Sequence, residues 1–406
     1  MQENTEKIYV IQPLFHDQNN SVLHDEIVAL IESAGAEYAG TIYQNIREIN
    51  PATFIGEGKL TELRERLDGL DLTVLFNGEL SPSQTLNISA ALDGKKVIDR
   101  TTLILDIFAL RAQSSEGKIQ VELAQLRYLY PRLKGKGEAL SRLGGGIGTR
   151  GPGETQLETD RRHIRTRIHA LEQKLDETEK RRSMQVERRK KDRVKTIALV
   201  GYTNTGKSTL LNYVTGANVL AKNSLFATLD PTARSFEIEG VEFLMVDTVG
   251  FLQSLPHHLI KAFRSTLESA LHCDLALIVC DGGGDYQMQL DTTLSTLQDM
   301  NFHSPYLVVV NQCDKLTDLS AFPKDAVCIS AKTGQGVDAL KERIFHALKD
   351  DFLRVRLTVP YEKMSEYASV RSLVTERTVE YTDFGAEIDA IVPTVYSEKV
   401  KPFLYK

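Results

Sequence analysis

The sequence lacks several features that would point to particular classes of protein. Its 406 residues contain no tryptophan, and only 7% of them are aromatic. No apolar run approaches the roughly 20 residues that a membrane-spanning helix needs. The first residues, Met1–Lys7, are polar and lack the apolar stretch of a secretory signal. We therefore expect a cytoplasmic protein with no membrane span.

Cysteine is also scarce, and its spacing argues against a zinc centre. The four cysteines lie in one region and show no C-x-x-C spacing: Cys273, Cys280, Cys313 and Cys328. We predict buried free thiols in a reducing compartment.

The charge of the chain is unevenly distributed. The chain is long enough for two to four domains, and its 42% hydrophobic and 26% charged residues argue against wholesale disorder. The net charge is −6, but residues 131–193 carry +8 and the remainder carries −14. Such asymmetry is typical of one surface that meets a polyanion while the rest of the molecule avoids it.

The first hundred residues alternate between two patterns. Strand-like runs cover 8–12, 37–43, 72–76 and 96–98, and helix-like runs cover 22–33, 58–67, 82–92 and 101–112. This alternation predicts a small α/β domain with a parallel sheet. The segment Gly56-Glu57-Gly58-Lys59 lacks the full spacing of a phosphate-binding loop, so we predict a turn before a helix there.

A different pattern follows from Ile119, where five apolar positions have helical spacing: Ile119, Leu123, Leu126, Tyr130 and Leu133. Eight glycines and one proline between 135 and 153 then predict an interruption, and a second helix opens near Glu154 and runs towards Asp192. We predict a helical hairpin with a glycine-rich, basic tip.

The region after Val194 carries a phosphate-binding loop. A strand-like run, Val194–Val200, leads into G-x-x-x-x-G-K-S and then a helix, and the loop residues are Gly201, Tyr202, Thr203, Asn204, Thr205, Gly206, Lys207 and Ser208. Main-chain N–H groups of such a loop bind phosphate. We expect Lys207 to reach the β- and γ-phosphates and Ser208 to ligate Mg²⁺.

Three later segments complete a guanine-nucleotide site, each at the end of an apolar strand. They are Asp247, Thr248, Val249 and Gly250; then Asn311, Gln312, Cys313 and Asp314; then Ser330, Ala331 and Lys332. Asp247 is expected to hold Mg²⁺ through water, and the Gly250 N–H to sense the γ-phosphate. The Asp314 carboxylate can accept from guanine N1–H and the 2-amino group, and the Ala331 N–H can donate to O6. Adenine would leave that carboxylate unpaired.

The first switch segment is expected between these motifs, at Phe226, Ala227, Thr228, Leu229 and Asp230. Thr228 and Thr232 are the two candidates for a further Mg²⁺ ligand, and the resemblance to a known family described below favours the Thr228 hydroxyl.

Two positions, Phe251 and Gln312, depart from common GTPase patterns, and a third, Asn204, bears on whether K⁺ is bound. Phe251 stands where Ras-like enzymes carry the glutamine that orients water, so intrinsic hydrolysis should be slow. Asn204 either helps to bind K⁺, as in some related GTPases, or hydrogen-bonds within the loop. Gln312 replaces the usual lysine of N-K-x-D, which should weaken nucleotide binding modestly without changing base choice.

A family resemblance rests on three motifs: the glycine-rich segment Ser141–Glu158, the segment Phe54–Lys59 and the switch segment Phe226–Thr232. They resemble signatures of the HflX family of translational GTPases over most of the chain. The resemblance implies a GTP hydrolase that binds the large ribosomal subunit and splits ribosomes or assists subunit maturation. It also implies that the ribosome stimulates GTP hydrolysis. We expect a monomer that binds GTP and GDP.

The sequence thus predicts an α/β protein in which a P-loop GTPase domain lies between two smaller domains. The expected boundaries are 1–115 for the N-terminal α/β domain, 116–193 for the hairpin, 194–352 for the nucleotide domain and 353–406 for a small α+β domain. RNA contacts are expected from the basic hairpin residues Arg132, Lys134, Lys136, Arg142 and Arg150. The alternatives are a nucleotide-dependent RNA chaperone or helicase, and a signalling GTPase with protein partners only.

Overall fold

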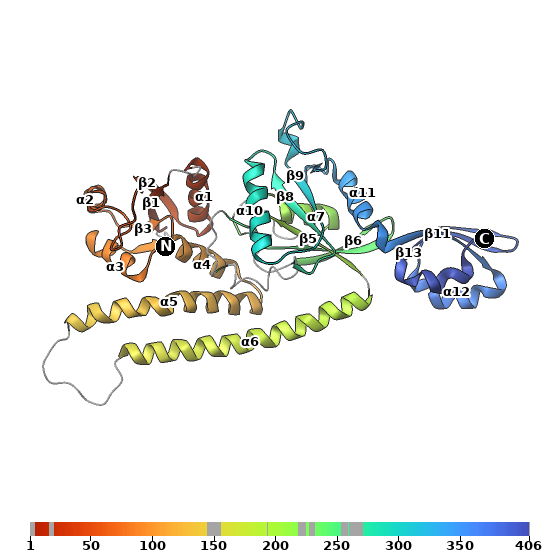
Figure 1. Ribbon diagram of the computed structural model, residues 1–406, viewed down its shortest axis with the longest axis horizontal. Helices are drawn as coiled ribbons and strands as arrows, with labels where there is room; N and C mark the ends of the chain where they lie inside the picture. Colours follow the sequence, from red (N-terminus) through yellow and green to blue (C-terminus); the bar gives the residue numbers. More distant parts are fainter. Residues whose placement is uncertain are drawn as a thin grey trace. The chain divides into compact units, whose positions relative to one another are not determined.

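The computed structural model describes residues 5–15, 20–143, 156–192, 194–217, 225–226, 232–252, 259 and 271–405. They belong to two compact units (Figure 1). The first contains Met1–Val186 together with the short later segments Lys222–Asp230 and Gln253–Ser265, and the second contains the rest. The division into four domains remains our proposal.

The N-terminal sheet is entirely parallel, in the order β2-β1-β3-β4. Its strands are β1 (Lys7–Leu14), β2 (Glu37–Asn45), β3 (Thr73–Phe76) and β4 (Val97–Asp99). Its helices are α1 (Asn20–Ser33), α2 (Glu57–Arg66), α3 (Pro82–Ala91) and α4 (Arg100–Arg111). Leu60 and Leu63 of α2 and Ile88 of α3 belong to one core with Tyr9, Ile11 and Phe76 of the sheet. The predicted parallel α/β domain is confirmed, including the turn at Gly56 before α2.

Two long antiparallel helices follow, α5 (Ser115–Leu143) and α6 (Gln156–Asp192) (Figure 1). Ion pairs join them, with Arg167 donating to Glu122 at 2.6 and 2.9 Å and Arg127 to Glu172 at 2.7 Å. The predicted hairpin is therefore present. Its expected interruption from residue 135 was wrong, since α5 continues through both Gly135 and Gly137 to Leu143. Two isolated glycines weaken a helix by about 1 kcal/mol each and need not end it.

The second unit contains a six-stranded sheet in the order β10-β9-β8-β5-β7-β6. Its strands are β5 (Lys195–Gly201), β6 (Thr232–Ile238), β7 (Val241–Asp247), β8 (Leu275–Asp281), β9 (Tyr306–Asn311) and β10 (Val327–Cys328). Only β6 is antiparallel to its neighbour. The helices of this part within the described residues are α7 (Lys207–Thr215), α10 (Tyr286–Asp299) and α11 (Val337–Ala347). The carboxyl ends of β5, β7 and β9 carry the predicted nucleotide motifs.

The C-terminal part of this unit is a small antiparallel sheet, β11-β13-β12, as the predicted α+β domain requires. Its elements are β11 (Phe352–Pro360), α12 (Met364–Val370), β12 (Thr375–Thr382), β13 (Gly385–Pro393) and α13 (Ser397–Val400). A separate core, which includes Leu357, Ile388 and Phe403, holds them together. Within the described residues, no helix combines the length and the apolarity that crossing a membrane would require.

Candidate nucleotide-binding site

The phosphate-binding loop joins the end of β5 to the first residue of α7. Gly206 caps α7 with φ of 89°, and a Cβ there would lie 2.3 Å from the Asn311 amide nitrogen. Only glycine fits both the backbone conformation and the available space. The loop therefore presents the N-terminus of α7 in the arrangement that binds phosphate through main-chain N–H groups.

Lys207 is buried within this loop. Its ammonium donates to the carbonyl oxygens of Gly201, at 3.1 Å, and of Tyr202, at 2.6 Å. Burial lowers the pKa of Lys207 to about 8, against the opposing attraction of the Asp247 carboxylate. A phosphate group arriving at the loop would supply the negative charge that this buried cation lacks.

Ser208 and Asp247 meet at the predicted Mg²⁺ position. The Ser208 hydroxyl donates to Asp247 Oδ2 at 2.6 Å, and Asp247 is fully buried at the end of β7. A hydroxyl and a carboxylate are the hard oxygen donors that Mg²⁺ prefers, so the pair fits this ion. Thr228, the further predicted ligand, lies outside the described residues.

Phe251 is held against the phosphate-binding loop by its main chain. Its N–H donates to the Gly201 carbonyl at 3.0 Å, and its carbonyl accepts from the Thr203 N–H at 2.7 Å. Its ring is buried, with 2% of the residue exposed. A Cβ on the preceding Gly250 would lie 2.7 Å from Thr203 Cα. Phe251 therefore fixes where this segment leaves the loop, a role that the sequence did not reveal.

Asn311 connects the phosphate loop to the guanine loop. Its amide nitrogen donates to the Thr205 carbonyl at 2.8 Å, and its side-chain oxygen accepts from the Ala331 N–H at 2.9 Å. The N–H that we assigned to guanine O6 thus has a protein partner in this structure. The donation to O6 stays a prediction, and it requires this bond to be shared or exchanged.

Gln312 lies in a left-handed conformation, with φ of 65°, beside the base loop. Its side chain bridges two charges, donating to Asp281 Oδ2 at 2.6 Å and accepting from Lys315 Nζ at 2.5 Å. The sequence did not point to Asp281 or Lys315. Asp314, the predicted purine selector, is exposed and accessible to a base.

The remaining predicted nucleotide residues fall into two groups. Those with a described position at the carboxyl edge of the sheet or in the loops there are Tyr202, Asn204, Thr248, Val249, Cys313, Ser330 and Lys332. Phe226 is buried and lies in the first unit. Outside the described residues are Ala227, Thr228, Leu229 and Asp230.

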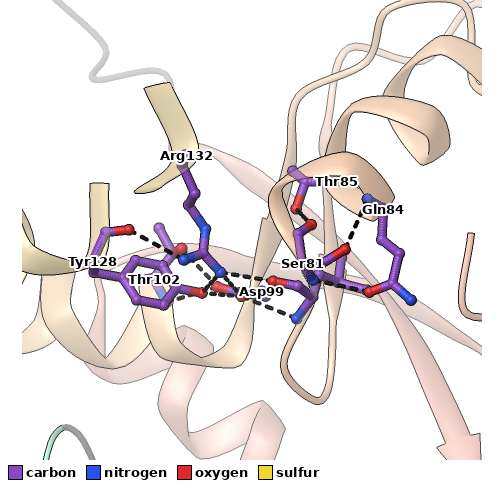
Figure 2. Close-up of polar contacts among 8 residues, drawn as sticks. Ser81, Gln84, Thr85, Asp99, Thr102, Tyr128 and Arg132 are labelled. Carbon is purple, nitrogen blue, oxygen red and sulfur yellow. Dashed lines mark hydrogen bonds and ion pairs between the residues drawn. The ribbon is translucent and has the colours of Figure 1, made fainter. Parts of the chain in front are cut away.

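The predicted RNA contacts lie on the hairpin, and the structure places one of their side chains. Arg132 of α5 packs over the Tyr128 ring, with its guanidinium carbon 3.4 Å from the ring centroid, and pairs with Asp99 (Figure 2). Lys134, Lys136 and Arg142 belong to α5, but their side chains, like the whole of Arg150, are outside the described part.

Comparisons with known proteins agree with this geometry. Residues 22–109 match the family described as GTP-binding GTPase N-terminal, and residues 111–189 match its middle region. Residues 196–312 match the family described as 50S ribosome-binding GTPase. GTPase HflX of Caldanaerobacter subterraneus subsp. tengcongensis is 46% identical over 94% of this chain and 90% of its own. The chain belongs to the HflX family of GTPases.

Other HflX proteins give the same result. GTPase HflX of Alkalihalophilus pseudofirmus is 45% identical over 88% of this chain and 86% of its own length, and that of Escherichia coli K12 is 42% identical over 82% and 81%. This HflX-family chain is therefore a P-loop GTP hydrolase that binds GTP and GDP. Among solved structures, a GTP-binding protein of Sulfolobus solfataricus in complex with GDP matches 85% of this chain and 99% of its own at 23% identity, with a TM-score of 0.44.

Proposed function

We propose that this GTPase associates with the large ribosomal subunit, inserts its basic hairpin into ribosomal RNA, and remodels or splits ribosomes under the control of GTP. The observation that supports this most is the hairpin itself. Residues 131–193, which include the end of α5 and the whole of α6, carry +8, and the rest of the chain carries −14. The description of the family matched by the nucleotide domain, 50S ribosome-binding GTPase, points to the same partner.

The nucleotide chemistry in this proposal uses the residues described above. The fixed dipoles of the loop and Lys207 bind the phosphates, and Ser208 and Asp247 hold Mg²⁺, with Thr228 joining when the γ-phosphate is present. When bound, Mg²⁺ neutralises charge that develops on the phosphate oxygens. With Phe251 where a water-orienting glutamine could be, intrinsic hydrolysis is slow and the ribosome stimulates it. Asn204 would position K⁺ if that ion takes part.

The test is co-sedimentation of the full chain with isolated large and small subunits, in GDP or in a non-hydrolysable GTP analogue. We expect association with the large subunit that is tighter with the GTP analogue. Lys207→Ala, which removes the phosphate-binding cation, should show no nucleotide binding by calorimetry and should lose this difference. Binding that is equal for both subunits or indifferent to nucleotide would contradict the proposal.

A second experiment addresses the hairpin. Neutralising Arg142 and Arg150 together should weaken association with the large subunit while leaving GTP affinity intact, because the phosphate-binding loop and the guanine loops belong to the second unit. The matched control neutralises two exposed lysines of that unit, Lys324 and Lys363. If the control pair weakened binding as much as the arginine pair, the arm would have no special part in it.

A further inference from the structure

A polar cluster ties the base of α5 to the N-terminal domain (Figure 2). Its centre is Asp99, the last residue of β4 and the N-cap of α4, which is 2% exposed. One carboxylate oxygen accepts from the main chain and hydroxyl of Thr102, at 3.0 and 2.7 Å. The other accepts from the Leu80 N–H at 3.3 Å, from Arg132 at 3.3 Å, and from the Tyr128 hydroxyl. Three elements therefore meet at one buried carboxylate.

Arg132 closes this cluster, which we name the Asp99 clamp (Asp99, Tyr128 and Arg132). Its guanidinium donates to the Leu80 carbonyl at 2.7 Å and to the Tyr128 carbonyl at 3.1 Å, and it also contacts the Tyr128 hydroxyl. The Leu80 loop is itself fixed, because Ser81 and Gln84 form a reciprocal cap at the start of α3. Burial raises the pKa of Tyr128, so its hydroxyl remains a neutral donor to Asp99.

The clamp lies beside a weak point of α5. Pro131, inside α5, lacks the N–H that would continue the helical hydrogen bonds, so the helix is weakened beside Arg132. The twelve residues from Arg132 to Leu143 extend about 16 Å, and a tilt of about 20° at the clamp would displace the helix end by roughly 6 Å. That is about twice the length of a hydrogen bond to phosphate.

We propose that the Asp99 clamp sets the direction of the basic hairpin, and that Arg132 is a positioning residue for subunit binding rather than an RNA contact. The inference rests on the proposed association with the large subunit. The Nη1 and Nη2 atoms of its planar guanidinium, which stacks on a ring, are bonded to two carbonyls and a carboxylate, an arrangement that lysine cannot reproduce. Arg132 is therefore removed from the predicted set of phosphate contacts, and Lys134, Lys136, Arg142 and Arg150 remain.

The experiment measures affinity for the large subunit against KCl concentration, using the full chain with the GTP analogue and five variants: Arg132→Lys, Arg132→Ala, Tyr128→Phe, Asp99→Asn and Arg142→Ala. A phosphate contact contributes to the slope of log K against log [KCl], whereas a positioning residue changes affinity at every salt concentration by the same factor. We expect Arg132→Lys, Tyr128→Phe and Asp99→Asn each to bind about tenfold more weakly with an unchanged slope. Arg142→Ala, the matched control, should make the slope shallower by about one unit.

The alternative, in which Arg132 contacts RNA, predicts different changes in affinity for the same variants. If Arg132 touched RNA, Asp99→Asn would free its guanidinium and strengthen binding, Tyr128→Phe would be neutral, and Arg132→Lys would bind like the wild type. Any of these results, or a shallower slope for Arg132→Ala, would overturn this inference and leave the proposed function standing. A wild-type chain without salt-dependent binding would overturn the proposed function and this inference with it. Asparagine still caps α4 and phenylalanine still fills the space of Tyr128, and unchanged GTP affinity and circular dichroism would confirm folding.

Discussion

At the scale of single residues, Lys207 makes nucleotide binding depend on pH. Its pKa is about 8 in the nucleotide-free protein, because burial opposes the charged form. Triphosphate favours the charged form, so binding raises that pKa and takes up a proton. The affinity for nucleotide is therefore highest well below pH 8 and falls as the pH rises through 8, by about fourfold between pH 7.0 and 8.5. Calorimetry in buffers of different ionisation enthalpy should detect this proton uptake, and release or no exchange of protons would contradict it.

Gln312 is the second residue with a prediction of its own. Its amide nitrogen is 2.6 Å from the Asp281 carboxylate, a position where an ammonium would form an ion pair. Gln312→Lys should therefore tighten GDP binding severalfold, measured by displacement of a fluorescent analogue, without admitting adenine nucleotides. Gln312→Met provides a side chain of similar length without the charge. If the lysine variant bound GDP no better than the methionine variant, the ion pair would have no role.

Residues that act through their side chains could be predicted from the sequence, and residues that act through their own main-chain groups could not. The loop motif specified Lys207 and Ser208, and the structure places Lys207 within the phosphate-binding loop and Ser208 beside Asp247. Their contacts with phosphate and Mg²⁺ stay predictions. Nothing in the sequence marked Phe251 as a main-chain partner of Gly201 and Thr203, because any residue can make those bonds. The bond between Arg132 and Asp99 could not be predicted for a related reason, since the two residues are 33 positions apart and only the fold brings them together.

At the scale of elements, helices and strands with a clear period were predictable. Each N-terminal strand follows its apolar run, and both hairpin helices follow their stripes. The antiparallel edge strand β6 was missed, because five of its seven residues are only partly buried or exposed and give a weak alternation. The end of the first hairpin helix was also placed too early. The low helix propensity of glycine is a weak preference, and the neighbouring turns of α5 override it at Gly135 and Gly137.

A buried ion pair joins two of these elements and gives an element-scale prediction. Arg100, at the start of α4, donates to the buried Glu26 carboxylate of α1 and to Asn77 Oδ1 at 2.9 Å, with side chains of the pair only 4% and 5% exposed. Arg100→Ala should destabilise the N-terminal domain by about 3–5 kcal/mol, because it leaves a charge buried without its partner. Chemical denaturation monitored by hydrogen exchange of the sheet would measure this loss.

The control for that prediction is the exposed pair between α5 and α6. Arg167 donates to Glu122 twice, but both side chains are 40% exposed or more, so Arg167→Ala should change stability little. A double variant, Glu26→Leu with Arg100→Met, should recover part of the stability that Arg100→Ala loses. Equal losses for Arg100→Ala and Arg167→Ala would show that burial of the first pair has no energetic consequence.

At the scale of the whole molecule, charge is separated along the chain. The hairpin concentrates +8, and the rest at −14 would be repelled by RNA at any distance shorter than the screening length, about 8 Å at physiological salt. Binding to a polyanion is then favourable only when the hairpin, and not the rest of the chain, approaches it. This separation is a property of composition, so it was visible in the sequence, whereas the direction in which the hairpin points required the fold.

The same separation predicts how steeply salt should weaken binding. With four remaining phosphate contacts, at Lys134, Lys136, Arg142 and Arg150, the slope of log K against log [KCl] should be about −3 to −4. Between 50 and 200 mM KCl the affinity for the large subunit should then fall by roughly a hundredfold. Neutralising Lys324 and Lys363 should leave the slope unchanged, because both residues lie in the second unit, away from the hairpin sequence. A slope near zero in the wild type would mean that binding depends on uncharged contacts, and the charge separation would need another explanation.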